Sequence, residues 1–196
     1  MQEKRKQVCV YCGSSDKANG KYIEAAYALG VEFVKNNYDL VYGGGARGSM
    51  NAIANAVMDN GGTVTGYIPQ FMMQVEWGKN NISKLIEVSD MSERKKKLIE
   101  NVDAVVAMPG GCGTLEELAE VISLKRLGQF LKPIVIFNQD GFYDDLISLF
   151  NKMIEHDFMR PEHGNIWAIA SKIEDVIPAI ENSKLWTADA IHSAAV

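Results

Sequence analysis

The chain has 196 residues and a mass of 21.6 kDa, and its 47% hydrophobic and 23% charged residues are typical of one globular domain with its own core. Its 20 Lys and Arg against 25 Asp and Glu give a net charge of -5, which argues against a general nucleic-acid binder and against binding to anionic membranes. The three cysteines are too few for a disulfide framework, and neither a membrane span nor a signal-peptide core is evident, so we expect a cytoplasmic protein.

Short apolar segments alternate with longer segments of helical periodicity along the chain. The apolar segments predict strands at Val8–Tyr11, Leu40–Tyr42, Thr63–Ile68, Leu85–Val88, Asp103–Met108, Pro133–Phe137 and Ile166–Ala170. The periodic segments predict helices at Lys21–Asn36, Ser49–Asn60, Ser92–Asn101, Leu115–Leu127, Tyr143–His156 and Ile173–Glu181. Strands that are apolar throughout indicate helices on both sheet faces, so we expect one α/β domain built on an open, doubly wound parallel sheet.

The first glycine-rich turn, at residues 43–50, reads GGGARGSM between a predicted strand and a predicted helix. It satisfies the dinucleotide pattern GxGxxG, but the next strand ends in Pro69-Gln70 instead of the acid that would bind a ribose diol. The phosphate-binding loop pattern also fails, because Ser49 occupies the position that requires lysine. A general cradle for phosphate or ribose and a plain tight turn both remain open.

The second glycine-rich turn, at residues 108–117, reads MPGGCGTLEE and again lies between a strand and a helix. Its glycines Gly110, Gly111 and Gly113 can expose backbone N–H groups at a helix start, where the helix dipole favours an anion. Thr114 and Glu117 also fit a capping box, in which each side chain pairs with a backbone N–H of the first turn. Glu117 is thus either a helix cap or a functional carboxylate.

The segment Asp90–Lys97 places four consecutive cations in the first turns of a predicted helix. Cations at this end oppose the helix dipole, and a bound anion would offset the cost. We regard Arg94 and Lys95 as candidate site residues, and we expect Lys96 and Lys97 to lie on a solvated face.

Cysteine and histidine chemistry is not expected. Cys9 and Cys12 have redox-pair spacing, but Cys9 lies within a predicted strand and Cys12 at its end, and both suit buried small apolar side chains. Only three histidines occur, all near the C-terminal end, and no Cys, His and Asp cluster has metal-ligand spacing. We therefore expect neither a metal nor a cofactor.

Three motifs in order resemble those of the LOG family, the cytokinin riboside 5'-monophosphate phosphoribohydrolases, also labelled "possible lysine decarboxylase". They are GGGARGSM at 43–50, MSERK at 91–95 and PGGCGTLEE at 109–117. The resemblance extends from about Val8 to Glu181 within a single domain that we expect to span 1–196. It implies a Rossmann-like homodimer that hydrolyses the N-glycosidic bond of N6-modified AMP or of AMP, releasing the free base and ribose 5-phosphate.

The resemblance also assigns roles to residues. It implies Arg94 and Glu117 as the catalytic pair. It implies substrate contacts at Gly44, Gly45, Met50, Glu76, Arg94, Lys95, Gly110, Gly111, Cys112, Gly113, Thr114, Leu115 and Glu116. Such a carboxylate can stabilise an oxocarbenium-like state and orient water, and a cation can meet charge on the leaving base.

The alternative is a non-catalytic protein of the same fold that binds a nucleotide or the molybdenum cofactor. Such a protein would keep the glycine turns without needing both Arg94 and Glu117. The sequence departs from the family at Lys79 and at Ser123-Leu124-Lys125, so both plain AMP and prenylated nucleotides remain open as substrates. A decarboxylase is not expected, because no element indicates pyridoxal phosphate on a lysine.

Overall fold

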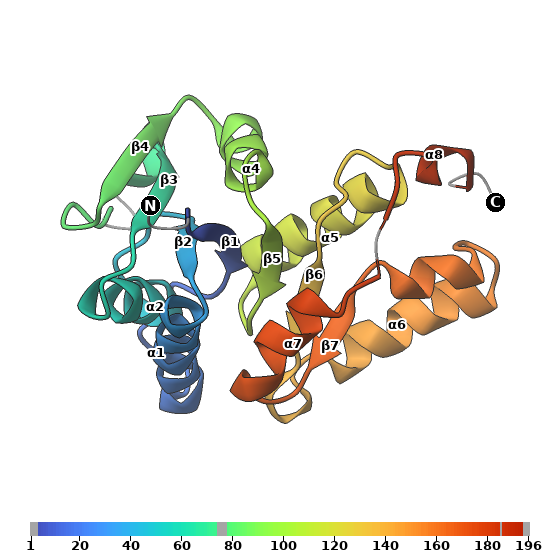
Figure 1. Ribbon diagram of the computed structural model, residues 1–196, viewed down its shortest axis with the longest axis horizontal. Coiled ribbons are helices and arrows are strands. Elements are labelled where there is room, and N and C mark those ends of the chain that lie inside the picture. The colour runs from blue at the N-terminus through green and yellow to red at the C-terminus, as the bar shows by residue number, and fades with distance from the viewer. Residues whose placement is uncertain (1–3, 74–77, 185, 194–196) are drawn as a thin grey trace.

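The computed structural model describes residues 4–73, 78–184 and 186–193 (Figure 1). Its seven strands form one sheet in the order β4-β3-β2-β1-β5-β6-β7, and every pair of neighbours is parallel. The strands are β1 Lys6–Tyr11, β2 Tyr38–Tyr42, β3 Val64–Pro69, β4 Lys84–Val88, β5 Ala104–Ala107, β6 Ile134–Phe137 and β7 Ala168–Ala170. All seven predicted strands are confirmed, with boundaries shifted by one or two residues.

All six predicted helices are confirmed; five of them connect consecutive strands, and the sixth follows β7. The α-helices are α1 Gly20–Lys35, α2 Gly48–Asp59, α3 Gln70–Met72, α4 Met91–Ile99, α5 Cys112–Arg126, α6 Asp144–Glu155, α7 Val176–Glu181 and α8 Ala190–Ser193. The 3₁₀ turns are η2 Gln139–Gly141, η3 Pro161–Asn165 and η4 Ile173–Asp175, of which η4 leads into α7. The periodicity did not reveal α3 and α8, because segments this short do not complete a repeating pattern.

Helices cover both faces of the sheet, so the doubly wound α/β prediction is confirmed. One apolar layer joins the sheet to α1, α2 and α7 through residues such as Phe33, Ile53 and Ile177. The other joins it to α4, α5 and α6 through residues such as Leu98, Leu118 and Phe150. None of the described helices is long and apolar enough to cross a membrane.

The chain order places a crevice at the centre of this sheet. The central strand β1 pairs with β2 on one side and with β5 on the other, as shown by Val8 opposite both Leu40 and Ala104. The connections after β1 and β5 therefore diverge beyond the carboxyl ends of these strands, where open α/β sheets bind ligands. The second glycine-rich turn follows β5 and lies at this point.

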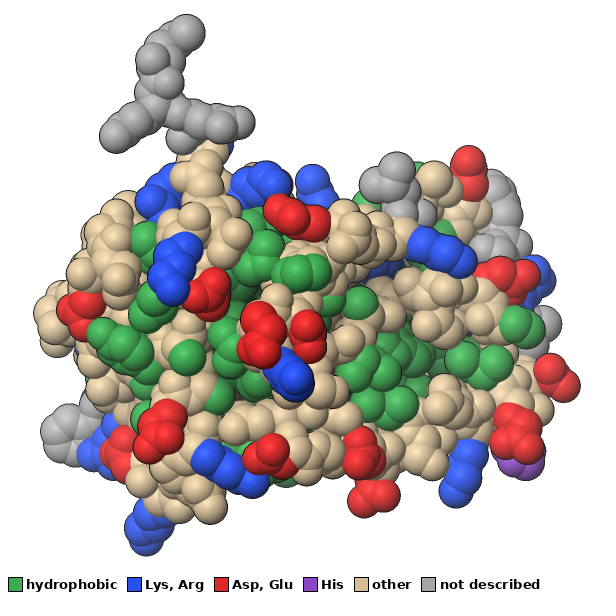
Figure 2. Space-filling view, turned by 60° about the horizontal axis from the view of Figure 1, so that its bottom comes forward, with side chains coloured by type: hydrophobic (Ala, Val, Ile, Leu, Met, Phe, Trp, Pro, Cys, Tyr) green, Lys and Arg blue, Asp and Glu red, His purple; other side chains and the backbone are tan. Residues whose placement is uncertain are grey.

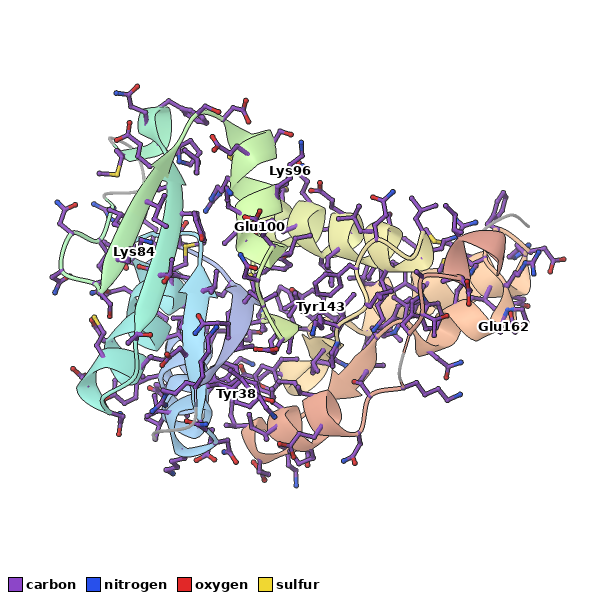
Figure 3. The ribbon with its side chains drawn as sticks, turned by 45° about the horizontal axis from the view of Figure 1, so that its top comes forward. Tyr38, Lys84, Lys96, Glu100, Tyr143 and Glu162 are labelled. Atoms are coloured by element: carbon purple, nitrogen blue, oxygen red, sulfur yellow. The ribbon has the colours of Figure 1, made fainter. Side chains whose placement is uncertain are left out.

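Charges on the visible surface are mixed. Figure 2 shows basic and acidic side chains interspersed over one face, with hydrophobic side chains gathered between them. On the α4 side, Lys96 and Glu100 lie exposed at the positions labelled in Figure 3. The expectation of a solvated face is thereby confirmed for Lys96.

Lys125, one of the departures from the family pattern, is buried at the carboxyl end of α5. Its Nζ donates to the Lys132 carbonyl at 2.9 Å and lies 5.9 Å from the centre of the Trp186 ring. Ser123 faces solvent, and Leu124 packs against the apolar layer of α4, α5 and α6. Leu124 and Lys125 are therefore part of the packing around the end of α5, whereas Ser123 lies on its surface.

We expect Lys125 to make stability rise with pH. Burial lowers its pKa from 10.5 to about 8, so between these pH values the unfolded chain binds more protons than the folded one. The free energy of unfolding then increases with pH in this window, by up to about 1.4 kcal/mol per pH unit. Urea unfolding at pH 7, 8 and 9 should show this rise in the wild type and not in Lys125→Met. Parallel curves for the two proteins would contradict the assignment.

Candidate active site

A cleft of about 190 Å³ opens at the carboxyl ends of β1 and β5. The residues lining it are Cys12, Gly13, Ser14, Met50, Met72, Met91, Arg94, Gly111, Gly113, Thr114 and Glu117. A second hollow of about 300 Å³ shares Gly13, Ser14 and Gly111 with it and continues past Gly110 to Tyr22 and Phe142. Together the two hollows reach the size of small-molecule sites, roughly 300–1,000 Å³.

The glycine-rich turn after β5 leaves space over its backbone. A Cβ atom added at Gly111 or at Gly113 would meet no protein atom within 4 Å, so these glycines are not required by protein packing. Gly110 differs, because its Cβ would collide with the Thr114 hydroxyl. The free space lies at the N-terminus of α5, where unpaired N–H groups and the helix dipole attract an anion.

The capping-box interpretation of Glu117 is wrong. The helix α5 begins at Cys112, three residues before the predicted Leu115, and its N-cap is Gly111. Thr114 is therefore the third residue inside the helix, and no side chain caps this N-terminus. Glu117 is the sixth residue of the helix, so it does not occupy the third position that a capping box requires.

Arg94 crosses from α4 into the cleft and is fixed by two main-chain carbonyls. Its Nε donates to the Tyr67 carbonyl at 3.1 Å, and its Nη2 donates to the Gly43 carbonyl at 2.9 Å. Met72 and Met91 place their sulfur atoms 3.9 Å from Nη1. The Arg94 side chain is 4% exposed, so its position is set by the fold and not by solvent.

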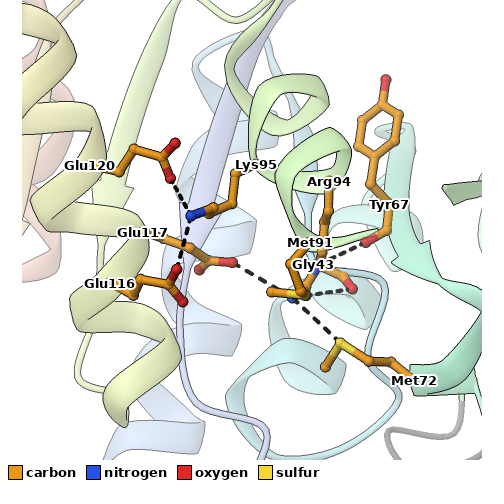
Figure 4. Close-up of polar contacts among 9 residues, drawn as sticks. All are labelled: Gly43, Tyr67, Met72, Met91, Arg94, Lys95, Glu116, Glu117 and Glu120. Carbon is orange, nitrogen blue, oxygen red and sulfur yellow. Dashed lines mark hydrogen bonds and ion pairs between the residues drawn. The ribbon is translucent and has the colours of Figure 1, made fainter. Parts of the chain in front are cut away.

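Glu117 meets Arg94 across the cleft, with Oε1 3.7 Å from Nη1 (Figure 4). Its side chain is only 7% exposed and lies on α5, one turn beyond Thr114. The arrangement brings a buried carboxylate and a buried cation together beside a helix N-terminus that suits an anion. This is a combination suited to stabilising charge that develops in a transition state.

Lys95 and Glu116, the sequence neighbours of this pair, lie outside the cleft lining. The Lys95 Nζ forms ion pairs with Glu116 Oε1 at 2.8 Å and with Glu120 Oε2 at 2.9 Å (Figure 4). These two carboxylates raise the pKa of Lys95 to about 12. Lys95 therefore links α4 to α5 as a cation.

The first glycine-rich turn supports Arg94. A Cβ atom on Gly43 would collide with Arg94 Nη2, so glycine leaves room for the guanidinium. Gly44 has φ +79° and its carbonyl accepts from the Lys79 N–H, while Gly45 bridges to Gly78. Within this turn, Met50 reaches the cleft lining, whereas Gly44 and Gly45 do not.

Lys79 joins the segment after α3 to α2. It is 6% exposed, and its Nζ donates to the side-chain oxygens of Asn51 at 2.6 Å and Asn55 at 2.7 Å. Lys79 thus holds this segment in place and is not part of the lining described above. The predicted Glu76 lies outside the described residues.

The structure therefore brings together Met50, Arg94, Gly110, Gly111, Gly113, Thr114 and Glu117 from the predicted set. Cys112 and Leu115 are exposed beside the cleft and do not line it. Sequence reasoning missed Cys12, Gly13 and Ser14 at the end of β1, and Met72 and Met91. The topological switch point after β1 could have indicated the first three, because ligands bind there in doubly wound sheets.

The interpretation of Cys9 and Cys12 as small buried apolar side chains is confirmed. Both thiols are buried, and burial, together with the nearby Glu117, raises their pKa values above the usual range for cysteine. Both therefore stay protonated, and neither is a nucleophile.

Comparison with known proteins identifies relatives over almost the whole chain. The family model described as "Possible lysine decarboxylase" matches residues 50–180. The cytokinin riboside 5'-monophosphate phosphoribohydrolase LOG1 of Arabidopsis thaliana is 39% identical, over 97% of this chain and 94% of that protein. The probable cytokinin riboside 5'-monophosphate phosphoribohydrolase LOGL2 of Oryza sativa subsp. japonica is 41% identical, over 92% of this chain and 74% of that protein.

Solved structures share the fold at lower sequence identity. The molybdenum cofactor carrier protein of Chlamydomonas reinhardtii superposes with a TM-score of 0.69 at 17% identity, covering 91% of this chain and 98% of that one. The molybdenum cofactor binding protein of Rippkaea orientalis gives a TM-score of 0.68 at 21% identity, covering 92% and 98%. At these identities the likeness shows the Rossmann-like fold alone.

Proposed function

The chain belongs to the possible lysine decarboxylase, or LOG, family, and we propose from this premise that it hydrolyses the N-glycosidic bond of a nucleoside 5'-monophosphate. The substrate is AMP or an N6-modified AMP of the cytokinin type, and the products are the free base and ribose 5-phosphate. The relatives at about 40% identity carry this activity in their names. The observation that carries the proposal is the buried Arg94–Glu117 pair, 3.7 Å apart, beside the open glycine-rich start of α5.

The positions of these groups support the following proposed roles. The backbone of Gly110–Thr114 receives the 5'-phosphate, because its open N–H groups lie at the positive end of a helix. That contact fixes the ribose so that its anomeric carbon faces Glu117. Glu117 stabilises the oxocarbenium-like state and orients or deprotonates the attacking water, and Arg94 offsets negative charge on the departing base.

The two other activities considered have less support. The similarity to molybdenum cofactor carriers extends to the fold, whereas a carrier has no need for the Arg94–Glu117 pair. Pyridoxal phosphate chemistry would require a lysine at the cleft, and no lysine is found among the described residues that line it.

Direct assay tests the proposal. The purified protein should be incubated separately with AMP and with N6-isopentenyladenosine 5'-monophosphate, and the products separated by chromatography. Release of free base from either nucleotide supports the function, and the ratio of the two kcat/KM values gives the preferred base. Intact nucleotides after incubation with concentrated protein would overturn it.

We expect turnover to depend on the 5'-phosphate. The 5'-phosphate is the substrate group that we assign to the open glycine turn, and its binding supplies the energy that positions the sugar. Adenosine should therefore have a kcat/KM at least about 10²-fold below that of AMP. N6-isopentenyladenosine should fall below its own 5'-monophosphate by a similar factor. Initial rates for nucleotide and nucleoside under identical conditions check this, and equal values would contradict the phosphate assignment.

We also propose that the protein works as a cytoplasmic homodimer. Beside the cleft, α5 exposes Leu115, Ala119 and Ser123, a row of small and apolar side chains suited to contact with a second copy. Light scattering after size exclusion should give about 43 kDa, twice the 21.6 kDa of one chain. A mass of one chain at micromolar concentration would contradict this expectation.

A further inference from the structure

Two adjacent links join α4 to α5 at the cleft (Figure 4). Arg94 and Glu117 form the inner link, with 3.7 Å between Nη1 and Oε1. Lys95 with Glu116 and Glu120 forms the outer link, with distances of 2.8 Å and 2.9 Å. Lys95 directly follows Arg94 in sequence, and Glu116 directly precedes Glu117. Glu120 lies one helical turn after Glu116.

The charged groups of the outer link pair with one another. Lys95 is 20% exposed and directs its ammonium to two carboxylates of α5, which are 55% and 37% exposed. None of the three side chains belongs to the lining of the cleft, whereas both Arg94 and Glu117 do. The geometry therefore separates the groups that can meet a ligand from the groups that join the helices.

The inner pair needs such support from outside. Its separation of 3.7 Å is longer than a direct hydrogen bond, so the pair by itself does not fix the distance between the helices. Arg94 is held on the β2 and β3 side by Gly43 and Tyr67, and Glu117 is carried on α5. A shift of α5 would therefore change the distance from Glu117 to Arg94 and to the sugar.

We infer that Lys95, Glu116 and Glu120 form a positioning clamp that sets the separation of Arg94 and Glu117 for glycosidic-bond hydrolysis. This inference rests on the proposed function. Glu120, to which the family resemblance gave no role, is thereby a positioning residue. The competing interpretation is the direct substrate contact predicted for Lys95 and Glu116. Substitutions in the clamp should lower kcat, whereas loss of a direct substrate contact should raise KM.

Glu120→Gln tests the clamp without touching the cleft. Glutamine keeps the size of the side chain and removes its charge, so Lys95 keeps one of its two ionic partners. We expect kcat for the nucleotide to fall about tenfold with KM within about twofold of wild type, because displacing a reacting group by a fraction of an ångström lowers the rate without weakening phosphate binding. The matched control is Lys97→Met, which breaks the 2.8 Å Lys97–Glu100 pair within α4 and should leave both constants unchanged.

A charge exchange provides the rescue. Lys95→Glu alone places three carboxylates together and should lower kcat at least as much as Glu120→Gln does. Combined with Glu120→Lys, it restores a cation between two carboxylates, because residue 120 lies one turn from Glu116 on the same helix. The double variant should recover kcat at least threefold relative to Lys95→Glu, and thermal melting shows that each variant folds.

The outcomes separate this inference from the proposed function. No turnover by the wild type overturns the function, and the clamp falls with it. Wild-type turnover with an unchanged kcat in Glu120→Gln overturns the clamp alone. A raised KM with unchanged kcat, or no recovery in the folded double variant, also overturns the clamp and favours direct substrate contact by Lys95.

Discussion

Replacing Glu117 by glutamine is expected to lower kcat by at least about 10²-fold, the low end for general acid–base groups. Glutamine has nearly the same shape, but it can neither accept a proton from water nor offset the charge of an oxocarbenium-like state. Because α5 begins at Cys112 with Gly111 as its N-cap, the substitution removes no helix cap. The loss should therefore be chemical, with nucleotide binding largely retained.

The measurement pairs kcat with the melting temperature and with the dissociation constant for AMP. Glu117 is buried beside Arg94, so some loss of stability is expected, and the binding measurement shows that the cleft still forms. The control is Glu100→Gln, which makes the same chemical change at an exposed position. Wild-type turnover in Glu117→Gln would show that this carboxylate is structural.

Arg94→Lys is expected to reduce kcat/KM by at least about 10²-fold although the charge is kept. The guanidinium donates to the Tyr67 carbonyl in β3 and to the Gly43 carbonyl just after β2, and still directs Nη1 at Glu117. A lysine ammonium is a single point on a flexible stem and cannot reach all three positions at once. Initial rates over a range of AMP concentrations, with melting curves for both proteins, check the expectation, and an activity within threefold of wild type would contradict it.

Gly43→Ala complements that experiment, because it displaces the Arg94 guanidinium while the arginine itself is kept. The added methyl would occupy the place of Nη2, and Gly43 has an ordinary negative φ or extended backbone that alanine can adopt. We expect a similar loss of kcat, together with some loss of stability, because the buried guanidinium must shift away from the Gly43 carbonyl. Gly111→Ala gives a contrast at the proposed phosphate turn: its methyl meets no protein atom, so any loss there reflects contact with the phosphate and appears in KM.

Much of the fold could be predicted from the sequence because its signals are local. A strand such as Ile134–Phe137 is apolar at every position, and a helix such as Gly20–Lys35 repeats its apolar residues with the helical period. The motif PGGCGTLEE likewise predicts an anion site from its own residues, since glycines at a helix start expose N–H groups wherever the helix lies.

The sequence by itself therefore determined the alternating strands and helices, the two glycine-rich turns and the candidates Arg94 and Glu117. Only the tertiary structure decided what these residues contact. The position of Gly43 beneath the guanidinium, the end of β1 in the cleft and the clamp of Lys95 with Glu120 all join segments distant in sequence. It also showed that Thr114 and Glu117 do not form a capping box, because α5 begins at Cys112 with Gly111 as its N-cap, and helix propensity alone does not fix where a helix begins.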